Sequence, residues 1–302
     1  MGELDSVHAS IDHEYERFVV GLREGLQGVA RHLPLRVGLT SRAGVGWSEA
    51  VEEPLILALP SLLLIAIRPP ATPELVTCAQ RVHLYAMLGA LVLAQADRGA
   101  VELDAELEEL LGQFERQRHR AVAELRLLGA EQGSSFTLAE REARGAAAQE
   151  LAALAGEDRV EVATCVAVHT RKSGLAFPAT MAAAAAAGLD AEGLAHVHDF
   201  VLGAILGIGF HREVTELADR ARAQRSWVVA LSRERGQPAA IGELLHLAID
   251  AFDRASAAAS VLGADALRRW AEQRREQVTR FARAEAAAGR ASLPTGSPAS
   301  AA

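Results

Sequence analysis

The stretch that decides the fold is DFVLGAILGIGFH at residues 199–211. It is apolar over most of its length and lacks the alternation of polar and apolar residues that marks a half-buried strand. Gly203 and Gly207 are four residues apart, so they share one face of the helix that we expect here. Glycines at this spacing let a second helix approach closely, or they leave room for a chain-like ligand. The stretch therefore predicts an apolar helix with small residues on one face.

The rest of the chain has the same helical character. The stretch RKSGL at residues 171–175 leads into an alanine-rich segment that ends at Gly188. Half of the residues are hydrophobic but only 4% are aromatic, and alanine is the best helix former. Because no segment shows strand alternation over a useful length, we predict one all-α domain of about ten helices over residues 1–290. Residues 291–302 are rich in Pro, Gly, Ser and Ala, and we expect them to be disordered.

The charge and the cysteines narrow the class of protein. A formal net charge of -8 argues against general nucleic-acid binding, which needs a basic face. Cys78 and Cys165 are far apart and lack metal-ligand spacing, which indicates a reduced intracellular protein. The N-terminus is polar and acidic, unlike a signal peptide, and the apolar run at residues 55–67 is too short to span a bilayer. We therefore expect a cytoplasmic protein without a transmembrane segment.

The order of motifs over residues 171–220 resembles the trans-isoprenyl diphosphate synthases and class I terpene synthases. In that superfamily a Lys-Thr-Gly/Ala-x-Leu element precedes a small-residue helix, and a second helix then carries Gly-x-x-x-Gly-x-x-Phe-Gln. Lys172 and Ser173 match the first element. The second is matched in spacing by Gly203, Gly207 and Phe210, with His211 in place of the glutamine.

The resemblance implies an isoprenoid-synthase-like helical bundle, in which Lys172 binds the diphosphate of a prenyl substrate. It also implies that four residues line a cavity for the prenyl chain: Gly203, Gly207, Phe210 and His211. Members of the superfamily form dimers. We therefore expect a prenyl diphosphate or isoprenoid ligand, and a homodimer or a heterodimer with a catalytic prenyl synthase.

The chain departs from the family at the second aspartate-rich motif, where the chemistry takes place. Counting on from His211, the aspartates would fall on Val214, Thr215 and Ala218. In the family, carboxylates from two facing helices hold the magnesium ions that neutralise the departing pyrophosphate, and magnesium requires oxygen ligands. Replacing them by these side chains should abolish that metal site.

The first aspartate-rich motif is missing in the same way. His83 and Arg98-Gly99 match residues that flank the motif in the family, and Arg98 is a second candidate for diphosphate binding. The aspartate positions between these anchors are Ala90, Leu91 and Ala94.

Other acidic residues lie near the missing motifs at different offsets. The candidates for metal ligands at these offsets are Asp97, Glu213, Glu216 and Asp219. Asp104 and Glu108 share a helix face, but such an acidic run is more typical of a helix N-terminus. No cofactor is indicated, and Mg²⁺ is expected only if the protein is catalytic.

Three functions remain open on these patterns. The first is a non-catalytic or atypical homologue that binds a prenyl chain, alone or as a partner subunit. The second is an active, divergent terpene cyclase or prenyltransferase that uses the acids named above. The third is a helical interaction protein with no isoprenoid ligand.

Overall fold

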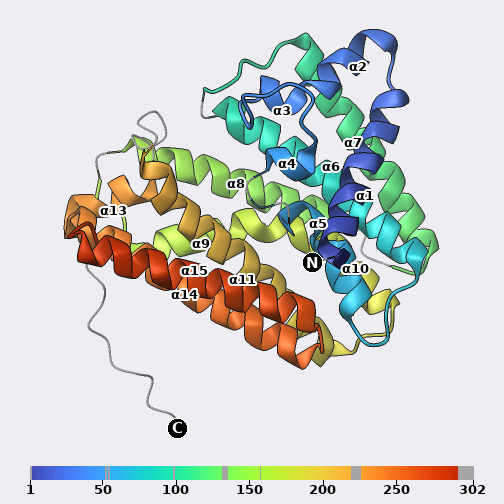
Figure 1. The fold of residues 1–302 in the computed structure, drawn as a ribbon. Coiled ribbons are helices and arrows are strands. Elements are labelled where there is room, and N and C mark those ends of the chain that lie inside the picture. Colours follow the sequence, from blue (N-terminus) through green and yellow to red (C-terminus); the bar gives the residue numbers. More distant parts are fainter. Residues whose placement is uncertain are drawn as a thin grey trace. The chain divides into compact units, whose positions relative to one another are not determined.

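The computed structural model describes residues 2–51, 53, 55–97, 99–130, 135–156, 158–218 and 226–291 (Figure 1). Over these ranges the chain forms helices, turns and loops, and no strand occurs among them. The predicted all-α class is therefore confirmed. The helices outnumber the ten or so that we predicted, partly because α3 (Leu33–Arg36) and α4 (Trp47–Ala50) are single short turns.

The residues group into two compact units. Unit 1 contains Met1–Gly133 and Leu175–Leu194, and unit 2 contains Ser134–Gly174 and Ala195–Ala302. The chain passes from one unit to the other three times, so neither unit is one continuous segment. The prediction of a single domain over residues 1–290 stays a prediction.

Unit 1 is built around α6 (Pro73–Asp97), which packs against α7 (Ala105–Leu127), α5 (Leu55–Ala66) and α10 (Phe177–Ala186). The first helix, α1 (Gly2–Val20), packs against α2 (Glu24–Arg31), α4 and α5. Aromatic rings of α1, α4, α6 and α7 contact one another in its core, and they belong to Tyr15, Phe18, Trp47, Tyr85 and Phe114.

The acidic run at the start of α7 caps that helix. The carboxylate of Asp104 accepts a hydrogen bond from the backbone N–H of Leu107 at 3.0 Å and also pairs with Arg36. This hydrogen bond, with Arg36 close by, holds the pKa of Asp104 below its ordinary value. The acidic run therefore lies at the N-terminus of α7 and caps it. This is the more common of its two interpretations, the other being a set of metal ligands.

Unit 2 contains α8 (Ser135–Ala155), α9 (Val162–Lys172), α13 (Trp227–Arg235), α14 (Gln237–Val261), α15 (Asp265–Ala287) and most of α11 (Ala191–Thr215). The short 3₁₀ helices η1 (Ser173–Ala176) and η2 (Glu216–Ala218) follow α9 and α11. Helix α14 packs along α15 and against α13, and α8 packs along α9, as Figure 1 shows. Of the predicted tail, Ala291 is buried, and residues 292–302 lie outside the described residues.

The glycines of the 199–211 stretch are where α11 meets α14. A Cβ atom on Gly203 would lie 2.5 Å from the carbonyl oxygen of Ala251 and 2.9 Å from the backbone nitrogen of Ala255. A Cβ on Gly207 would lie 2.8 Å from ring atoms of Phe252. At both positions a second helix therefore approaches α11 closely. This is one of the two interpretations of these glycines.

We predict that Gly203→Ala destabilises the protein by about 1–3 kcal/mol or more, since the new methyl group meets backbone atoms that cannot turn away. Chemical denaturation followed by circular dichroism measures this change. The matched control is Gly145→Ala in α8, where the methyl group meets nothing within 4 Å. The control should stabilise the protein by about 0.5–1 kcal/mol through helix propensity. Equal stability of the two variants would contradict the close packing of α11 on α14.

Candidate functional site

Unit 2 contains a group of polar side chains contributed by α8, α9, α11 and α13. We call it the Glu150 cluster, and its members are Glu150, His169, Lys172, Glu213 and Trp227. The side chain of Glu150 is only 13% exposed, and that of Lys172 is 31% exposed. A charged group shielded from water as Glu150 is needs partners, so the contacts within the cluster matter for the packing of these helices.

Glu150 receives hydrogen bonds on both carboxylate oxygens. The ammonium of Lys172 donates to Oε2 at 2.5 Å, and the indole N–H of Trp227 donates to Oε1 at 3.0 Å. Burial raises the pKa of Glu150, but the charge of Lys172 and these two hydrogen bonds outweigh it and hold the pKa below its ordinary value. Glu150 is therefore ionised at neutral pH.

Glu213 is the second carboxylate of the cluster. Its Oε2 accepts a hydrogen bond at 3.0 Å from the backbone N–H of Trp227, which belongs to the first turn of α13 and has no partner within that helix. Burial raises the pKa of Glu213 to about 7, and the charge of Glu150 adds to this, while the Trp227 N–H and Lys172 oppose it. The two carboxylates are thus shifted in opposite directions by their surroundings.

His169 completes the cluster from α9. Its ring makes an edge contact with Phe210, at 5.0 Å between ring centroids, and lies 6.1 Å from the ring of Trp227. Gly209 makes room for it, because a Cβ there would lie 3.2 Å from Nδ1 of His169. One ligand atom from each of Glu150, His169 and Glu213 lies within 4.8 Å of the other two.

Cys165 lies one turn before His169 on α9 and is fully buried. Burial raises the pKa of its thiol far above the ordinary value, and the nearby charges of Glu213 and Glu150 raise it further. A thiol that stays protonated is a poor nucleophile, which argues against Cys165 as a reactive group.

Among the predicted metal and diphosphate ligands that the structure describes, two lie together and two do not. Lys172 and Glu213 both belong to the Glu150 cluster. Glu216 pairs with Arg212 at 2.5 Å, and Asp97 is an exposed residue at the end of α6 in unit 1. Arg98 and Asp219, predicted to bind diphosphate and metal, lie outside the described residues.

The four residues predicted to line a cavity have specific neighbours in unit 2. Gly203 and Gly207 face α14, as described above. Phe210 is buried against His169, and the ring of His211 makes an edge contact with Phe281 of α15, at 5.5 Å between ring centroids. Their role in lining a prenyl-chain cavity stays a prediction.

Sequence reasoning missed Glu150, His169 and Trp227. His169 and Lys172 are three residues apart and share a face of α9, which is the one local signal available. Glu150 comes from α8, which also carries other glutamates and arginines, and nothing in that pattern distinguishes it from them.

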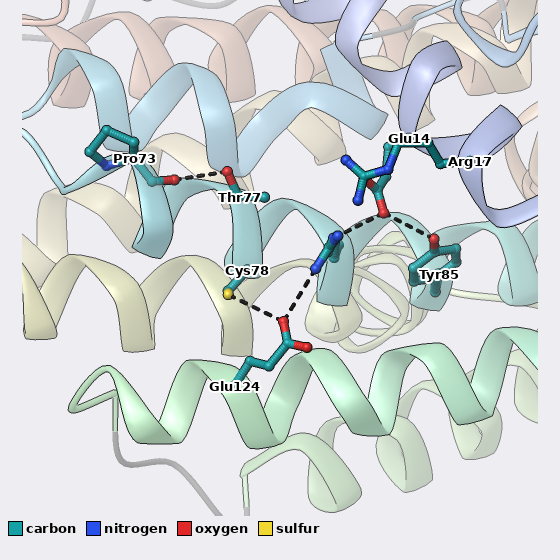
Figure 2. Close-up of polar contacts among 8 residues, drawn as sticks. Glu14, Arg17, Pro73, Thr77, Cys78, Tyr85 and Glu124 are labelled. Carbon is teal, nitrogen blue, oxygen red and sulfur yellow. Dashed lines mark hydrogen bonds and ion pairs between the residues drawn. The ribbon is translucent and has the colours of Figure 1, made fainter.

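A second group of polar side chains, in unit 1, lines a pocket of about 260 Å³ between α1, α6 and α7. Arg81 donates to Glu14 at 2.9 Å and to Glu124 at 3.2 Å. Tyr85 also donates to Glu14, at 3.3 Å. Figure 2 shows this contact and the thiol of Cys78, which points to Glu124. Glu14 and Glu124 thus share the charge of Arg81, so this group serves to hold the three helices together.

Comparisons of the chain with protein-family models, with curated proteins and with solved structures found no match. By length and composition, α6 and α11 are each able to cross a membrane. However, 56% of the most apolar 18-residue stretch of each helix is buried inside the protein, and the core helix of a soluble protein has the same length and composition. The family resemblance and the cytoplasmic location therefore stay predictions.

The raised pKa of Glu213 predicts a pH-dependent stability. The folded state holds the Glu213 proton up to about pH 7, whereas the unfolded chain releases it near the ordinary carboxyl value. The wild type should therefore lose stability relative to Glu213→Gln as the pH rises from 5 to 8, by about 2 kcal/mol for a partly buried group. Urea denaturation in the presence of EDTA at several pH values measures this difference. Glu234→Gln, which changes an exposed carboxylate on α13, is the control. A difference between wild type and Glu213→Gln that is the same at pH 5 and pH 8 would show that Glu213 is not desolvated.

Proposed function

We propose that this chain is a non-catalytic, isoprenoid-synthase-like protein that binds a prenyl diphosphate or a related isoprenoid. It acts alone or as the partner subunit of a catalytic prenyl synthase. The observation that carries the proposal is the absence of carboxylates at every position where the resemblance assigns a metal-binding aspartate. Those positions are Ala90, Leu91, Ala94, Val214, Thr215 and Ala218.

The helices that would carry the two motifs support this proposal. Ala90, Leu91 and Ala94 belong to α6, and Val214 is buried near the end of α11. Both helices are long and largely apolar, with side chains that offer no oxygen ligands for Mg²⁺ at these positions. Without these ions the pyrophosphate leaving group is not neutralised, so binding is proposed without ionisation of the substrate.

Lys172 is the group that we propose to contact the diphosphate. It is in the last turn of α9, and its side chain is 31% exposed, so part of this side chain reaches solvent. In the structure it is bound to Glu150. A diphosphate carries more negative charge than a carboxylate and can replace Glu150 as the partner of Lys172.

A second candidate is a helical interaction protein with no isoprenoid ligand. The packing of Gly203 and Gly207 favours it, because Ala251 and Phe252 fill the space beside both glycines. A prenyl chain would then have no room at this face of α11.

Binding and turnover of prenyl diphosphates by the full-length protein test these proposals together. Farnesyl and geranylgeranyl diphosphate are titrated with and without Mg²⁺, and released pyrophosphate is measured in the same samples. We expect binding without release. Lys172→Met should weaken binding at least tenfold, since a charge-assisted contact is lost. Arg171→Met removes the neighbouring exposed cation and should leave binding unchanged.

The other outcomes point to the other functions. Mg²⁺-dependent release of pyrophosphate would show that acids outside the usual motifs form an active site. Absence of binding to either diphosphate would contradict the isoprenoid proposal and leave the interaction protein as the better account.

A further inference from the structure

We propose that Glu150, His169 and Glu213 form a binding site for a divalent transition-metal ion, of which Zn²⁺ is the representative. The site is distinct from the positions where the family resemblance places metal ligands. It does not depend on an isoprenoid ligand, so it can be correct even if the proposed function is wrong.

The geometry of the three side chains carries the proposal. They come from three different helices, α8, α9 and α11, and their ligand atoms lie within 4.8 Å of one another. Zinc with bonds of about 2.1 Å to nitrogen and oxygen brings ligand atoms to about 3.4 Å apart in a tetrahedral site. The remaining difference is within the reach of side-chain rotation, with no movement of the helices.

Trp227 holds both carboxylates in place. Its indole N–H donates to Glu150 Oε1 and its backbone N–H donates to Glu213 Oε2, each at 3.0 Å. Outer hydrogen bonds of this kind orient the ligands of metal sites. One residue at the start of α13 thus aims two carboxylates at the same place, and a metal needs only one oxygen from each.

Lys172 provides the positive charge next to Glu150 in this cluster. Its ammonium lies 2.5 Å from Glu150 Oε2, which is the oxygen that Trp227 does not use. A bound metal ion and the ammonium would therefore be two cations on the same carboxylate, and they would compete for Glu150. Removing Lys172 should therefore strengthen metal binding, whereas removing one of the three ligands should weaken it.

The donor set selects the kind of metal. One imidazole nitrogen and two carboxylate oxygens suit zinc and other first-row transition ions, whereas Mg²⁺ prefers oxygen ligands alone and keeps several waters. Three protein ligands also leave a fourth tetrahedral position open to water. The inference concerns binding, and no reaction is assigned to the ion.

Zinc titration of the EDTA-treated full-length protein tests the site. Binding is followed by calorimetry, with Co²⁺ as a second probe whose absorption reports its coordination. We expect one tight Zn²⁺ per chain, and an excess of Mg²⁺ should not displace it. His169→Gln and Glu213→Gln should each weaken binding at least tenfold, as expected for the loss of one of three ligands. Lys172→Met should tighten it several-fold.

A matched control separates this site from zinc bound at the surface. His246 and Asp250 form an exposed pair one turn apart on α14, at 3.4 Å, and such a pair can bind zinc weakly. His246→Gln should leave the tight site unchanged.

Three results would overturn the proposal. They are no tight zinc in the wild type, full affinity in folded His169→Gln, or loss of tight binding in His246→Gln. If the ligand variants or Lys172→Met fail to fold by circular dichroism, the absorption of Co²⁺ bound to the wild type decides, because a six-coordinate spectrum contradicts a tetrahedral site with three protein ligands. Failure to bind prenyl diphosphates would have no bearing on these results.

Discussion

Unit 2 depends on the interaction that neutralises the carboxylate of Glu150, which lies between helices of this unit. A carboxylate that is only 13% exposed is costly unless cationic and hydrogen-bonding partners surround it. Lys172 from α9 and Trp227 from α13 provide them, so three helices are tied to one side chain. Removing one partner from such a pair leaves an uncompensated charge, which typically costs about 3–5 kcal/mol in fully buried cases.

The small residues of α11 act together with this polar contact. Gly203 and Gly207 admit α14, and Gly209 admits the ring of His169. One helix therefore contributes close packing through its glycines and a polar contact through Glu213 near its C-terminal end. Gly209 is not one of the two glycines whose spacing suggested a ligand cavity, and it lies beside His169, whose ring also contacts the next residue, Phe210.

The all-α class could be predicted because it depends on local properties: alanine content, the absence of strand alternation and the positions of glycine and proline. The cap at Asp104 is local in the same sense, since an acidic run before an apolar helical pattern has one common role. The close approach at Gly203 was one of two interpretations, and the spacing alone could not choose between a second helix and a ligand.

The Glu150 cluster could not be predicted from the sequence, because its members are far apart in the chain and meet only through tertiary packing. Glu150 and Trp227 are 77 residues apart, and no periodic pattern links a glutamate of α8 to the first residue of α13. Lys172 was identified through a family motif that suggested an external anion, whereas in the structure its partner is a carboxylate of the protein itself.

The most direct test of the account is a crystal structure of the full-length protein grown with Zn²⁺, with diffraction data recorded on both sides of the zinc absorption edge. The proposed zinc site predicts an anomalous peak about 2.0–2.2 Å from ligand atoms of Glu150, His169 and Glu213, with Lys172 moved away from Glu150. Zinc found only at surface histidines, or a structure in which the three side chains lie apart, would contradict it.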